Sequence, residues 1–70
     1  MMPLNMIGAG NSAFVRRVSG NDETRRYLGN LGFVNGAEVH VVSEIGGNVI
    51  VSIKDSRIAI NKDMASHILV

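Results

Sequence analysis

Apolar and polar residues alternate along two stretches in the middle of the chain. Over residues 37–41 the valines point to one face, while Glu38 and His40 point to the other. Over residues 49–54 a valine or isoleucine at every odd position again faces one way. Strict alternation is typical of half-buried strands, and the glycine pair at 46–47 supplies a tight turn between them. The pattern therefore predicts a hairpin.

Shorter apolar stretches predict further strands on both sides of this hairpin. The first covers residues 13–18, where Val18 breaks the alternation and indicates a bulge or the end of the strand. Two more follow at 58–60, after a short turn at Asp55-Ser56, and at 67–70. Residues between these last two strands are expected to form a single helical turn from Asn61 to Ala65.

One stretch instead shows the signals of a short helix over residues 22–31. Asn21 can cap the first backbone N–H groups, and the two acidic residues that follow it face the positive end of the helix dipole. Gly32 stands where a left-handed residue is wanted after the last turn. The apolar residues at helical spacing are Tyr27, Leu28 and Leu31. We expect Leu28 and Leu31 to belong to the core.

Together these segments predict one domain over residues 1–70 that is mainly β. It should contain about five short strands, with one short helix after the first strand. Short strands leave unpaired edges unless the sheet curls on itself, so we expect a small, partly open β-barrel covered on one side by the helix. The same exposed edges allow a homo-oligomer.

Composition agrees with a sheet-rich core and limits the partners. Hydrophobic residues make up 46% of the chain but aromatic residues only 4%, which favours a core of valine, isoleucine, leucine and alanine. The chain has no cysteine, which excludes disulfides and thiolate metal sites. Its net charge of +1 lacks the basic excess of a dedicated nucleic-acid binder, so no nucleic acid is predicted as a partner.

Nothing in the sequence directs the chain into a membrane. Its start lacks the charged region and long apolar run of a secretory signal peptide. No apolar stretch approaches the roughly 20 residues needed to cross a bilayer. We therefore expect a cytoplasmic protein without direct membrane insertion.

The residue types that carry catalysis or bind metals are present but not grouped. No serine stands in a recognisable nucleophile context, and Asp22 and Glu23 are better explained as charges at the start of the helix than as an acid–base pair. His40 and His67 form no local ligand pair such as His-x-x-x-His. The sequence predicts no enzyme activity, no cofactor and no metal site.

A protein–protein contact is the function that the surface residues favour. Arg25, Arg26 and Tyr27 lie on the helix, and Ile50 should point outward where a polar residue would be expected. Exposed arginine and tyrosine beside an apolar residue is a composition that interfaces favour, so these four residues are the predicted partner-binding surface. The arginines at 16–17 and 25–26 also allow an RNA-binding small barrel. However, Asp22 and Glu23 lie one helical turn before Arg25 and Arg26 and can screen their positive charge.

The order of these signals resembles the FeoA family over essentially the whole chain. The most specific stretch is 25–39, where an arginine and a leucine precede Leu-Gly, a second glycine and a strand. Asn35 and Ala9 stand where the family often has proline, and Asn61 stands where it often has arginine. The opening and closing positions that match are Leu4, Ile7, Gly10, Ala13, Val15, Val18, Ile58, Ala59, Ile60, Ala65, Ile68 and Val70.

The resemblance implies an SH3-like barrel in the cytosol that is an accessory to bacterial ferrous-iron uptake. The implied partner is FeoB, a membrane ferrous-iron transporter with a cytosolic G domain, which the barrel would bind and modulate. Two other functions stay open at this point: a small-barrel RNA-binding module, and a direct carrier of ferrous iron through His40 and His67.

Overall fold

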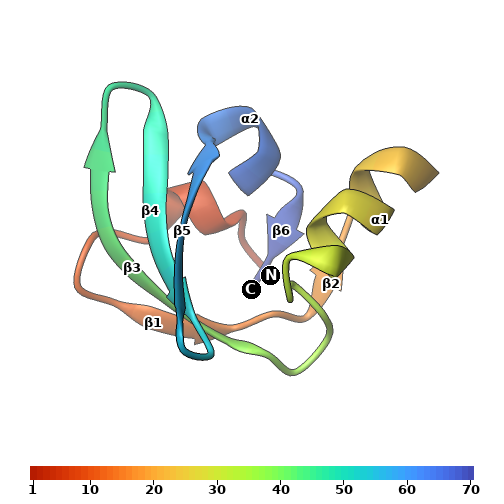
Figure 1. The fold of residues 1–70 in the computed structure, drawn as a ribbon, viewed down its shortest axis with the longest axis horizontal. Helices are drawn as coiled ribbons and strands as arrows, with labels where there is room; N and C mark the ends of the chain where they lie inside the picture. Colours follow the sequence, from red (N-terminus) through yellow and green to blue (C-terminus); the bar gives the residue numbers. More distant parts are fainter.

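The strands form two antiparallel sheets, and the computed structural model describes residues 1–70. The helical elements are η1 (Leu4–Met6), α1 (Asp22–Asn30) and α2 (Lys62–Ala65). The strands are β1 (Ser12–Phe14), β2 (Arg17–Val18), β3 (Glu38–Ile45), β4 (Asn48–Ile53), β5 (Ser56–Asn61) and β6 (Ile68–Leu69). One sheet has the order β1-β3-β4-β5 and the other pairs β2 with β6 (Figure 1). No helix is both long enough and apolar enough to span a membrane.

Two tight hairpins build the larger sheet. Gly46 and Gly47 have φ of 51° and 82°, which is the backbone of a type I′ turn and matches the twist of the strands that it joins. Lys54, with φ of 54°, begins the second two-residue turn, one residue earlier than the sequence predicts. The predicted hairpin over 37–54 is confirmed, and the strand expected at 58–60 extends over all of β5.

The prediction of one strand over residues 13–18 is wrong, because the chain turns a corner there. The Val15 N–H donates to the Ala37 carbonyl at 2.8 Å, on the side of the larger sheet. The next N–H, that of Arg16, donates to the Leu69 carbonyl at 2.8 Å, on the side of the smaller sheet. Two consecutive residues therefore bond to different sheets, and six strands result where the sequence predicts about five.

Asparagine side chains start both α-helices. Asn21 Oδ1 accepts from the Thr24 N–H at 2.8 Å, and Asn61 Oδ1 accepts from the Met64 N–H at 2.7 Å. Each bond satisfies one of the N–H groups that a helix leaves without a partner in its first turn. The predicted helix at 22–31 and the predicted helical turn before the last strand are thus both confirmed, with α1 ending one residue early.

The core between the sheets and helices contains no buried polar residue. All 12 buried residues are hydrophobic, and most are valine, isoleucine or leucine. Strand β4 supplies three of them, Val49, Val51 and Ile53, and α1 supplies Leu28. Leu31 packs against this core while partly exposed. The molecule is a mainly β, partly open barrel, as predicted, with its opening beside the unpaired edge of β5.

Two glycines at the end of α1 should respond in opposite ways to substitution by alanine. Gly29 lies inside the helix with open space where an added methyl group would point, so Gly29→Ala should raise the free energy of unfolding by about 0.5–1 kcal/mol. Gly32 has φ of 108°, so Gly32→Ala should lower it by about 1–3 kcal/mol. Urea unfolding followed by circular dichroism measures both. A shift of both variants in the same direction would contradict this account of the helix end.

Candidate functional site

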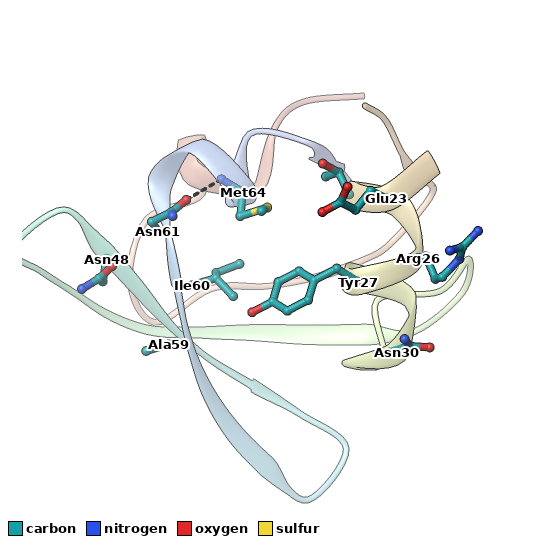
Figure 2. A pocket seen from close by; sticks show the side chains of 10 residues that line it. Glu23, Arg26, Tyr27, Asn30, Asn48, Ala59, Ile60, Asn61 and Met64 are labelled. Carbon is teal, nitrogen blue, oxygen red and sulfur yellow. Dashed lines mark hydrogen bonds between the residues drawn. The ribbon is translucent and has the colours of Figure 1, made fainter. Parts of the chain in front are cut away.

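An open groove of about 640 Å³ runs between α1 and the edge of the larger sheet. One wall is the exposed face of α1, and the other is formed by β5 and the start of α2 (Figure 2). The groove occupies the place where the barrel is open, because β5 has no strand neighbour on this side. The fold therefore creates this groove by leaving one strand edge unpaired.

The helix wall follows from the spacing of four residues. Glu23, Arg26, Tyr27 and Asn30 stand at positions i, i+3, i+4 and i+7 and so share one face of the helix. Leu28, one position after Tyr27, turns into the core and fixes this face outward. The Tyr27 side chain is 50% exposed and reaches from α1 toward β5 across the groove (Figure 2).

The opposite wall combines small, apolar and polar side chains. Ala59 is exposed and contributes only a methyl group, which leaves room beside the strand. Ile60 faces the core but reaches the groove at the strand edge, and Met64 of α2 is half-buried above it. Asn61 is held by its capping bond to α2. The backbone of this wall is fixed by the pairing of β5 with β4 and by the Asn61 cap of α2.

The charges of the groove are not neutralised within the molecule. The only salt bridge joins Arg25 to Asp22 on the exposed side of α1. Arg26 and Glu23, which both line the groove, have no ion-pair partner. Exposed pairs contribute little to stability, so the Arg25–Asp22 pair serves mainly to hold Arg25 toward the helix start.

The structure brings together two of the four residues predicted to bind a partner. Arg26 and Tyr27 line the groove, whereas Arg25 lies outside its lining. Ile50 is half-buried on β4, directly opposite Ala59 on β5, so it adjoins the groove without lining it.

Eight of the ten residues that line the groove are not among the predicted partner-binding residues, and three of these, Ala59, Asn61 and Met64, belong to the wall that faces α1. The capping pattern at Asn61 was the available signal, because it places the start of α2 next to β5. Ala59 and Met64 gave no local signal, since only the packing of α1 beside β5 turns them into a wall.

The two histidines lie in different parts of the barrel. His40 Nδ1 is 2.8 Å from Ser12 Oγ on the larger sheet, beside a shallow depression of about 410 Å³. His67 Nδ1 is 3.2 Å from Ser19 Oγ, next to the smaller sheet. No group of three or more histidine, cysteine, aspartate or glutamate side chains is placed to hold a metal ion.

Comparison with known proteins identifies the architecture. The FeoA domain model matches residues 2–70. An iron uptake regulatory protein (FeoA) of known structure is 30% identical, with a TM-score of 0.88, over 96% of this chain and 89% of that chain. The FeoA protein of Stenotrophomonas maltophilia, solved with zinc and described as a prokaryotic SH3 domain protein, is 32% identical, with a TM-score of 0.86, over 99% of this chain and 88% of that one.

More distant proteins share the fold alone. A manganese-dependent transcriptional repressor is 22% identical, with a TM-score of 0.85, over 94% of this chain and 38% of its own length. No curated protein matches. The SH3-like barrel that the sequence resemblance implied is confirmed.

The separation of the histidines leads to a prediction about iron. Each imidazole has one serine as its side-chain partner, whereas a stable site for a transition metal generally uses several protein ligands. Anaerobic calorimetry with ferrous iron should therefore show no tight, saturable binding to the purified chain. His40→Ala and His67→Ala should leave this result unchanged. Tight binding that the double variant abolishes would instead support the iron carrier.

Proposed function

The chain belongs to the FeoA family, and on that basis we propose that it is a cytosolic accessory protein of bacterial ferrous-iron uptake. Its proposed partner is the FeoB-type transporter, which it would bind and modulate through the cytosolic G-domain region. The similar protein from Stenotrophomonas maltophilia, described as a factor proposed to activate bacterial ferrous iron transport, supports this role. The function needs a binding surface and no catalysis, cofactor or resident metal.

The observation that carries the proposal is the exposed pair Arg26 and Tyr27 in the groove. Both side chains are displayed by a helix whose other face is anchored in the core through Leu28. Neither has an internal partner, since Arg26 forms no salt bridge and Tyr27 forms no side-chain hydrogen bond. Arginine and tyrosine are enriched among residues that dominate binding energy at interfaces. The groove thus presents two exposed side chains, without partners inside the molecule, of the type that binding partners engage.

Binding to the cytosolic part of FeoB, with and without guanine nucleotide, tests the proposal directly. Saturable binding would support an adaptor, and a change in GTP hydrolysis in the same samples would make the chain a regulator. Absence of binding would overturn the contact with the cytosolic part. Binding to RNA that falls steeply with salt would support the RNA-binding alternative.

Reversal of charge on α1 should weaken the complex without unfolding the barrel. We expect Arg25→Glu combined with Arg26→Glu to lower the affinity for FeoB by about tenfold or more, because interface arginines commonly contribute about 1–2 kcal/mol. Most of the loss should come from Arg26, which lines the groove. Isothermal titration of each variant measures the change.

Arg16→Glu combined with Arg17→Glu provides a matched control, because these two residues are also exposed but lie outside α1 and the groove. Their reversal should leave the affinity within about threefold of the unmodified chain. Equal losses in both double variants would indicate a general effect of net charge. An unchanged affinity in the α1 variant would remove Arg25 and Arg26 from the proposed surface.

A further inference from the structure

The outer edge of β5 carries backbone groups that face away from the sheet. A two-residue turn joins Ile53 to Ser56, and in such hairpins the flanking pair is hydrogen-bonded. Hydrogen-bonded pairs then recur at every second residue, so the even-numbered residues of β5 bond to β4. The Lys62 N–H, which donates to the Gly47 carbonyl at 3.1 Å, continues the same alternation beyond the strand.

The odd-numbered residues of β5 are therefore the ones whose N–H groups point outward. These residues are Arg57, Ala59 and Asn61, and β5 has no strand neighbour on their side. Ala59 and Asn61 also line the groove. A row of backbone donors and acceptors thus borders the groove along its sheet wall.

Of the devices that usually protect an exposed strand, this edge has only a charged residue, Arg57. Natural edges are blunted by charged side chains, by proline, by bulges, by short length or by a covering element. β5 has six residues with no proline and pairs in unbroken register with β4. The opposite edge strand, β1, has only three residues before the chain turns the corner at Val15 and Arg16. β5 is consequently the one long edge of the larger sheet.

We propose that an extended segment of the partner adds to β5 as a further strand, within the groove between β5 and α1. This inference rests on the proposed function and specifies the mode of contact. A strand lies about 4.8 Å from its neighbour, so the segment would hydrogen-bond to the outward groups of β5 while its side chains meet Tyr27 and Met64. Affinity would come largely from main-chain bonds, and specificity from the groove side chains.

Charge indicates which segment fits. Arg57 is exposed at one end of the edge and Arg26 stands on the helix wall, and neither forms a salt bridge. Within the lining Glu23 and Arg26 offset each other, so the excess positive charge along this edge comes from Arg57, which lies outside the lining. The segment should therefore carry an acidic residue, and it should lack proline at positions that must donate to β5.

A second copy of the barrel does not fit the same place. If β5 of a second copy paired with β5 of the first, β4 of the second copy would lie next to that added strand. It would then enter the space that α1 of the first copy occupies on the far side of the groove. The groove has walls on both sides, with α1 facing the free edge of β5, which favours a separate segment over the edge of a whole sheet. The occupant is thus a separate extended segment.

Hydrogen exchange measured by NMR on the full chain, with and without the cytosolic part of FeoB, tests the edge. In the free chain the amides of Arg57, Ala59 and Asn61 should exchange much faster than those of Ile58 and Ile60, which bond to β4. Added FeoB should slow the three outward amides and leave the other two little changed.

Each other outcome overturns the inference in a distinguishable way. Saturable binding without protection of the outward amides would remove the edge contact but leave the proposed function standing. No binding would remove both. Protection that depends on the concentration of the chain alone would identify a second copy as the occupant and contradict the assigned segment.

A pair of variants at Ala59 gives an independent test. Ala59→Pro removes one outward N–H without removing a bond to β4, and proline is tolerated on edge strands. It should lower the affinity for FeoB by about tenfold, and by clearly more than Ala59→Ser, which keeps the N–H and adds only a hydroxyl group to the groove wall. Equal affinities of the two variants would overturn the proposed backbone contact, provided that both show the exchange pattern of the folded chain.

Discussion

Strand β4 is the constraint on which the rest of the structure depends. Both of its edges are paired, with β3 on one side and β5 on the other, while Val49, Val51 and Ile53 on one face are buried. A shift of one residue in either pairing would move these side chains to solvent, so the core fixes the register. The sheet wall of the groove is fixed in the same way, because the position of β5 beside α1 is set by its pairing with β4.

Local features of the fold could be predicted from the sequence, and long-range features could not. The start of α1 and the hairpin at 46–47 depend on a cap, glycines and alternation within a few residues, and these predictions are confirmed. The corner at Val15 and Arg16 depends on carbonyls of Ala37 and Leu69, which lie far along the chain. A run of apolar residues therefore suggested one strand where the structure has two.

The candidate site also has one part that could be predicted from the sequence and one part that could not. Arg26 and Tyr27 could be found from residue type and helical spacing, because one face of a helix is visible in the sequence. The facing wall could not, since Ala59 and Met64 have no distinguishing chemistry until the barrel places them across from α1. The groove accordingly combines a helix face that can be found in the sequence with a strand edge that appears only in the fold.

The corner at Val15 and Arg16 also separates the barrel into parts whose strand pairings span very different lengths of chain. The β3–β4–β5 meander needs only two-residue turns to form. The β2–β6 ladder joins Arg17 to Leu69 and thereby closes a loop that includes most of the chain. Closing so long a loop costs more chain entropy than closing a two-residue turn. The meander that carries β5 can thus assemble before the ends of the barrel meet, and the smaller sheet completes a scaffold already in register.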